Sequence, residues 1–312
     1  MRFGIAVVPL TALALVATGC SAFEESGADP SDGVTVAAAF YPLAYVAERV
    51  AGDHAEVTLL TQPGTEPHDL ELAVDETAEI AGADLVLFEH GFQPAVDDAV
   101  EQNAGGVPLD AAEVVGLLPA EESPEEHAEH EDEHEDEHDH GDVDPHFWQD
   151  PVRVADLGDA VADELAEIDP GHAEDYTANA AALRADLAAL DELFTTGLAD
   201  CARDTVVVSH DAFGYLEKYG VRIAPLVGLS PDAEPSPAVL GEVQELILDE
   251  GITTVFSEPL EPDLVAGLAA DLDLATGSLD PIEGLTDSSS GEDYVSLMES
   301  NLAAIRAANE CR

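Results

Sequence analysis

Short apolar runs of strand length alternate with longer helical segments along most of the chain. In the first part, the expected strands are 34–39, 55–60, 84–88 and 107–109, and the expected helices are 43–51, 74–81 and 94–102. Strands that alternate with helices form parallel sheets covered by helices. The alternation returns at residue 205 and continues toward the C-terminus, with expected helices that include 212–219 and 292–309. The pattern therefore predicts an α/β protein with two parallel-sheet lobes.

Two long helical segments separate these lobes. They cover residues 151–168 and 173–198, and the second is rich in alanine with leucines at helical spacing. We expect a long rigid helical connector over 151–199, an N-terminal lobe over 34–150 and a C-terminal lobe over 200–312. Because ligands bind beyond the carboxyl ends of parallel strands, a ligand is expected in the cleft between the lobes.

Residues 120–143 do not fit the alternation. They mix histidines with carboxylates and have no apolar repeat, which predicts a disordered loop. Imidazole and carboxylate groups are ligands for borderline divalent metals, so the loop indicates metal capture more than a solvated acidic surface. The loop histidines are His127, His130, His134, His138 and His140.

The charge of the chain limits its partners. Nine basic residues stand against 68 acidic ones, which gives a formal net charge of −59. Such a surface repels nucleic acid and anionic lipid headgroups, so neither is expected as a partner. It attracts cations, although salt screens this attraction strongly.

The N-terminus is typical of an exported protein. An apolar run ends at Ala17-Thr18-Gly19-Cys20, which reads as a lipobox, so residues 1–20 are expected to be a lipoprotein signal peptide with Cys20 as the lipidated residue. Residues 21–33 would be a flexible tether. Contact with the membrane would then be through this lipid anchor only. The alternative is cleavage nearby and release of the protein outside the cytoplasm.

Two further cysteines, Cys201 and Cys311, lie in the second half of the chain. In an exported protein such a pair more often forms a disulfide than a reactive site. We expect the bond to fix the C-terminal helix to the start of the second lobe.

Four residues that could bind a metal stand at comparable places. His68, His210 and Asp280 follow expected strands, and His146 lies just before the connector. Three histidines and one carboxylate suit tetrahedral Zn²⁺, whereas Mn²⁺ favours more oxygen ligands. Such a closed set leaves no open position for an activated water, so an enzyme is not expected. Taken singly, each histidine could equally serve a loop or a helix cap.

The surroundings of these residues closely resemble a known family. The segments PGTEPHDLE (63–71), DPHFWQDP (144–151), SHDAFGYL (209–216), LDP (279–281) and FYPL (40–43) are similar to those of the metal-binding solute-binding proteins of ABC importers, the zinc/manganese cluster. The resemblance implies two α/β lobes with limited hinge motion and a metal held by His68, His146, His210 and Asp280. A histidine-rich loop and a cysteine pair in the second lobe are typical of its zinc-preferring members.

The resemblance implies that the protein captures Zn²⁺ outside the membrane and delivers it to an ABC permease. We expect one tight zinc site. Weaker sites in the loop would gather zinc or receive it from a donor protein. The protein is expected to be a monomer. The alternatives are a manganese or iron carrier, an adhesin or a metal buffer of the same fold. Glu66 could replace or assist Asp280, His90 could lie near the cleft, and Trp148 is expected to form its wall. His54 and His172 are expected to be solvated.

Overall fold

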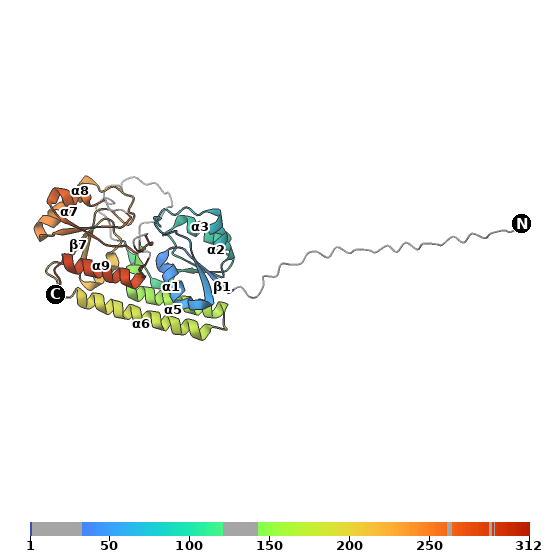
Figure 1. Cartoon of the computed structure of the whole chain (residues 1–312). Helices are drawn as coiled ribbons and strands as arrows, with labels where there is room; N and C mark the ends of the chain where they lie inside the picture. Colours follow the sequence, from blue (N-terminus) through green and yellow to red (C-terminus); the bar gives the residue numbers. More distant parts are fainter. Residues whose placement is uncertain (2–32, 121–142, 261–263, 287–288, 290) are drawn as a thin grey trace. The chain divides into compact units, whose positions relative to one another are not determined.

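Two four-stranded parallel sheets form the two predicted lobes in the computed structural model (Figure 1). The structure describes residue 1 and residues 33–120, 143–260, 264–286, 289 and 291–312. The expected signal peptide, Cys20, nearly all of the tether and the five loop histidines lie outside the described residues. None of the described helices is long and apolar enough to span a membrane.

The first sheet has the strand order β2-β1-β3-β4. Its strands are β1 (Val34–Ala38), β2 (Ala55–Leu59), β3 (Leu85–Phe88) and β4 (Val107–Asp110), and its helices are α1 (Tyr41–Ala51), α2 (Val74–Gly82), α3 (Pro94–Asn103) and α4 (Ala111–Val115). Pro42 lies in the first turn of α1, where its missing N–H costs nothing. The loops that follow the strands leave the sheet at its carboxyl edge, and His68 lies in one of them, between β2 and α2.

The second sheet has the order β10-β9-β7-β8. Its strands are β7 (Thr205–Val208), β8 (Arg222–Pro225), β9 (Thr254–Ser257) and β10 (Ala275–Ser278), and its helices are α7 (Pro237–Glu250), α8 (Ala266–Leu272) and α9 (Tyr294–Ala308). The helix expected over 212–219 is instead a short 3₁₀ helix, η4 (Gly214–Tyr219), which ends at Gly220 with φ +87°. The two strands that it joins are adjacent, and 3₁₀ geometry is common in such short connections.

The helical connector consists of α5 (Pro151–Ile168) and α6 (Ala173–Gly197), which lie side by side (Figure 1). Asp150 caps α5 by accepting a 2.9 Å hydrogen bond from the Val152 N–H. The longer helix α6 packs against α1 of the first lobe and α9 of the second. One hydrophobic core includes buried residues of both lobes and of this connector, so the two sheets share a common support.

The short strands β5 (Leu118–Pro119) and β6 (Val143–Asp144) form an antiparallel pair between the first lobe and the connector. The Tyr215 hydroxyl accepts a 2.9 Å hydrogen bond from the Leu118 N–H and donates a 2.8 Å hydrogen bond to the Asp144 carbonyl. The pair therefore places His146, two residues after β6, against the second lobe.

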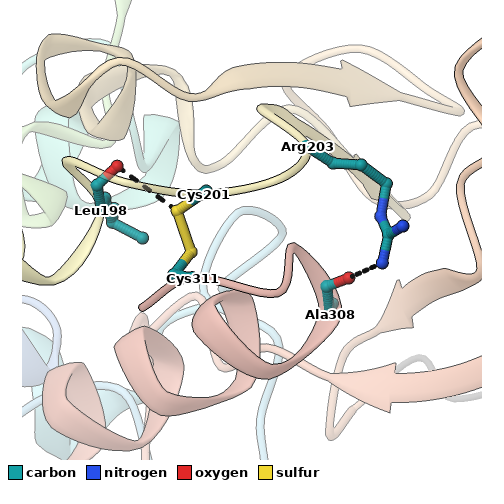
Figure 2. The surroundings of a disulfide bond; sticks show 5 residues. All are labelled: Leu198, Cys201, Arg203, Ala308 and Cys311. Atoms are coloured by element: carbon teal, nitrogen blue, oxygen red, sulfur yellow. Dashed lines mark hydrogen bonds between the residues drawn. A yellow bond between two sulfur atoms is a disulfide. The ribbon is translucent and has the colours of Figure 1, made fainter.

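The C-terminal segment is attached to the start of the second lobe. The sulfur atoms of Cys201 and Cys311 lie 1.95 Å apart, at the separation of a disulfide (Figure 2). Arg203 adds a 2.9 Å hydrogen bond from Nη2 to the Ala308 carbonyl, near the end of α9. The position of the two cysteines agrees with the attachment that the sequence predicts.

Replacing both cysteines by serine is expected to lower the free energy of unfolding by about 2–5 kcal/mol, because the bond closes a long loop in the unfolded chain. The two residues are separated by 110 positions. Chemical denaturation with and without reductant measures the effect. The reductant should destabilise the natural chain to the same extent and leave the double variant unchanged. Peptide mapping that found both thiols free would contradict the prediction.

Candidate metal centre

One histidine-rich group of side chains converges between the lobes. His68, His146, His210 and Glu283 each contribute a ligand atom, and these atoms all lie within 4.8 Å of one another. The Oε1 atom of Glu283 is 3.6 Å from Nε2 of His68, 3.3 Å from Nε2 of His146 and 3.4 Å from Nε2 of His210. For ligands bound at about 2.0–2.1 Å, a tetrahedral ion requires separations of about 3.3–3.4 Å. The observed separations are close to this value.

Three of these side chains lie in loops that follow strands of the parallel sheets, and the fourth, His146, follows the antiparallel β5–β6 pair. His68 lies between β2 and α2, and His210 lies two residues after β7. His146 precedes the 3₁₀ helix η3 (Phe147–Gln149), and Glu283 lies between β10 and α9. Each lobe thus contributes part of the group, as expected for ligands bound beyond parallel strands.

The ligand atoms themselves have no hydrogen-bond partner among the described residues. They are Nε2 of His68, His146 and His210 and Oε1 of Glu283, and all four are buried. A buried polar atom without a partner is costly, so most such atoms in folded proteins are paired with protein or water. Four such atoms that face one another at metal-ligand spacing are therefore best explained as a cation site.

Two carboxylates orient two of the histidines. Oδ1 of Asp144 lies 2.8 Å from Nδ1 of His146, and Oε1 of Glu258 lies 2.6 Å from Nδ1 of His210. A carboxylate that accepts the Nδ1 proton leaves the Nε2 lone pair free for a metal. Sequence reasoning missed Glu258, although its position directly after β9 is the same signal that pointed to the other site residues.

The histidines and Glu283 shift one another's pKa. Burial lowers the pKa of His146 and His210, but the hydrogen bonds to Asp144 and Glu258 and the nearby Glu283 carboxylate outweigh it and raise these values to about 9 and about 10. Burial raises the pKa of Glu283, but the three imidazoles that face its carboxylate outweigh burial and hold this pKa well below its usual range. Without metal, the group therefore holds protons where the cation would be.

The structure places a different carboxylate beside the histidines than the one expected from the sequence. Asp280 lies outside the converging group, and Glu283 takes the place expected for it. The Asp280 side chain accepts a 2.8 Å hydrogen bond from the Ile282 N–H through Oδ1, and its own N–H donates to Asn301. Burial raises its pKa to about 6. Asp280 therefore shapes the turn that presents Glu283.

Of the three residues expected near the ligands, two lie beside the converging group and one lies away from it. Trp148 is fully buried, with its ring 5.2 Å from that of His146, and it donates a 2.8 Å hydrogen bond to the Pro281 carbonyl. Glu66 accepts a 3.1 Å hydrogen bond from the His68 N–H, and burial together with Glu283 raises its pKa to about 7. His90 lies away from the group, 71% exposed, with Nδ1 3.4 Å from Asp97.

The chain is similar to known zinc-binding and zinc-uptake proteins. Residues 36–308 match the family model ZnuA, described as "Zinc-uptake complex component A periplasmic". The chain is 34% identical to the zinc-binding lipoprotein AdcA of Streptococcus pneumoniae, over 98% of this chain but 60% of that protein. It is 31% identical to the high-affinity zinc uptake system protein ZnuA of Bacillus subtilis, over 97% and 96% of the two chains.

Solved structures share the fold. The Zn(II)-bound ZnuA-like domain of Streptococcus pneumoniae AdcA is 31% identical, with a TM-score of 0.71 over 89% of this chain and 99% of that one. The laminin binding protein Lmb of Streptococcus agalactiae, described as a bifunctional protein with adhesin and metal transporting activity, is 25% identical. Its TM-score is 0.75 over 88% and 99% of the two chains.

Proposed function

The chain belongs to the ZnuA family of zinc-uptake components, and on that premise we propose that it captures Zn²⁺ outside the cytoplasm and delivers it to an ABC-type import permease. The family consists of transport components and not of enzymes. The observation that carries the proposal is the set of three imidazole nitrogens and one carboxylate oxygen, buried and unpartnered among the described residues at metal-ligand spacing.

The proposed tight site holds one Zn²⁺ through His68, His146, His210 and Glu283. Three nitrogen ligands favour zinc over manganese, which prefers oxygen. Four protein ligands close a tetrahedral shell, so the ion would be held as cargo and not used to activate water. The orienting carboxylates Asp144 and Glu258 support zinc binding by increasing the basicity of the imidazoles.

An adhesin role is the second candidate, supported by the description of the similar protein Lmb. Zinc capture is favoured because the description of the matching family and the names of the relatives AdcA and ZnuA all refer to zinc. A manganese or iron carrier would use the same fold, but the single carboxylate of the converging group suits these more oxygen-preferring ions less well.

We further propose that residues 120–143 form an accessory zinc-gathering loop whose five histidines bind weakly and pass zinc to the tight site. Deleting residues 121–140 is expected to lower the zinc stoichiometry or slow loading while the tight site persists. Replacing His146 by alanine, by contrast, should damage the tight site itself. Calorimetric titration separates the two effects. Loss of the tight site on loop deletion would contradict this division of roles.

The protein would be attached to the outer face of the membrane through lipid on Cys20, with residues 21–33 as the tether. Its partners would be the permease and, for the loop, a zinc donor protein, with the chain acting as a monomer. Its net charge of −59 disfavours nucleic acid and anionic membrane surfaces as partners.

Deleting the gene in its source organism tests the transport role. The deletion should slow growth and zinc accumulation when zinc is limited by a chelator, and added zinc should restore both. The natural chain should complement the deletion, whereas the Glu283→Gln variant should not. Normal zinc accumulation in the deletion strain under chelation would argue against uptake as the function.

A further inference from the structure

The Asp144 residue that orients the ligand His146 is itself contacted by a segment of the second lobe. This segment is Gly214-Tyr215, the first two residues of η4, and it begins four residues after the ligand His210. Tyr215 and Asp144 are both buried, with 2% and 6% of their surface exposed. One segment therefore follows a ligand of the second lobe and also contacts the residue behind a ligand that precedes the connector.

The Tyr215 hydroxyl holds the backbone of Asp144. It donates a 2.8 Å hydrogen bond to the Asp144 carbonyl and accepts a 2.9 Å hydrogen bond from the N–H of Leu118, the residue paired with Asp144 in the β5–β6 pair. The guanidinium of Arg153 on α5 lies over the Tyr215 ring, with Cζ 5.1 Å from the ring centroid. A movement of η4 would therefore break these hydrogen bonds or carry Asp144 with it.

Gly214 leaves the space that the Asp144 carboxylate occupies. A Cβ atom at this position would lie 2.9 Å from Oδ2 of Asp144, which is closer than Cβ atoms approach other atoms in folded proteins. The backbone itself does not require glycine here, because the φ of Gly214 lies outside the left-handed region. Oδ1 of the same carboxylate accepts the His146 N–H at 2.9 Å and lies 2.8 Å from its Nδ1. A side chain at position 214 would thus displace the carboxylate that orients His146.

We propose that Gly214 and Tyr215 are positioning residues for zinc binding, and that they act on His146 through Asp144. The inference rests on the proposed function, because it takes zinc as the ligand of the metal centre. It adds that the second lobe, which carries the ligands His210 and Glu283, also sets the orientation of a third ligand. Groups behind a ligand contribute to affinity because they fix the orientation of the imidazole. The two halves of the metal centre are therefore coupled through Asp144.

The alternative is that Gly214 and Tyr215 only support the fold, by packing η4 against the β5–β6 pair. The two roles differ in how the zinc affinity responds when Asp144 has no carboxylate. An effect that acts through this carboxylate disappears with it, whereas a general loss of stability remains. Two changes that act through one shared group are non-additive, so a double variant separates the two roles.

The first test is Tyr215→Phe, which removes the hydroxyl and keeps the buried ring. We expect the zinc affinity of the full chain to fall about tenfold, at the lower end of the effect of removing a group behind a ligand. Tyr219→Phe is the matched control, because Tyr219 lies in the same helix and its hydroxyl donates a 2.7 Å hydrogen bond to Asp191 on α6 instead. Chelator competition with Zn²⁺ measures the affinity, and chemical denaturation of the metal-free chains measures the stability. The control should keep the natural zinc affinity whatever its stability.

The second test is Gly214→Ala, which should also weaken zinc binding about tenfold. In a chain that already carries Asp144→Ala, the same change should have no further effect, because the oxygen that the new methyl group would meet is gone. The proposal is overturned if Tyr215→Phe binds zinc as tightly as Tyr219→Phe, or if Gly214→Ala changes the zinc affinity equally with and without the Asp144 carboxylate. Either result would leave the proposed function standing, whereas a natural chain without a tight zinc site would overturn both.

Discussion

Replacing Glu283 by glutamine is expected to weaken zinc binding by more than about 100-fold, which exceeds the usual effect of removing an orienting group behind a ligand. Glutamine has nearly the same shape but lacks the charge. Oε1 of Glu283 is the only carboxylate oxygen in the converging group of described residues, and it lies 3.3–3.6 Å from all three imidazole nitrogens. Chelator competition measures the change in affinity.

Asp280→Asn is the matched control for this variant. An asparagine Oδ1 can still accept the Ile282 N–H, so the turn that presents Glu283 should persist and zinc affinity should remain close to natural. The two variants remove the same charge from positions three residues apart. If Asp280→Asn weakened zinc binding as strongly as Glu283→Gln, the assignment of Glu283 as the ligand would be wrong.

Zinc affinity is expected to fall steeply as the pH falls. The carboxylates around His146 and His210 raise their pKa to about 9 and about 10, so both imidazoles carry a second proton near neutral pH in the metal-free protein. Zinc binds the neutral form, and its binding therefore releases these protons. Each proton released changes the affinity about tenfold per pH unit, so two protons give about a hundredfold.

The direction of the pH dependence follows from the direction of the pKa shifts. Because the pKa values of His146 and His210 are raised in the metal-free protein, protons compete with zinc throughout the neutral range. The zinc affinity therefore rises with pH until the pH exceeds these two pKa values. Chelator competition at about pH 6, 7 and 8 measures the slope, and calorimetry in buffers of different ionisation enthalpy counts the protons. An affinity that stayed constant over this range would show that the two histidines are already neutral without metal.

The lobes could be predicted from the sequence because their signals are local. The three histidines of the converging group could be selected as candidates only when the family resemblance of the segments around them was added to their positions in this pattern. Each strand is a short apolar run, and His68 and His210 follow such runs in segments rich in turn residues. The position of a residue just after a parallel strand already places it at the ligand-binding edge of the sheet. His146 stands out through the aromatic segment that follows it and anchors it in the core.

The sequence could not predict that Glu283, and not Asp280, joins the converging group, because this depends on the path of one loop. Ile282 between them has φ +63°, an uncommon conformation for a β-branched residue, and Trp148 and Gln149 both donate hydrogen bonds to the Pro281 carbonyl. These contacts rotate the chain so that Asp280 closes the turn and Glu283 faces the histidines.

The rings of His54 and His172 stack with their centroids 4.0 Å apart, and this contact was hidden from the sequence for a similar reason. The two residues are far apart along the chain, and each lies at the edge of a helix with no local sign of a partner. Only the packing of α1 against α5 and α6 brings them together. Tertiary packing, not local pattern, decides which exposed histidines become neighbours.

A competition titration of Zn²⁺ against Mn²⁺ on the metal-free full chain tests the central claim most directly. We expect one tight zinc equivalent that excess manganese does not displace, because three imidazoles and one carboxylate favour zinc. Manganese that bound this site as tightly as zinc, or a chain without a tight zinc equivalent, would contradict the account.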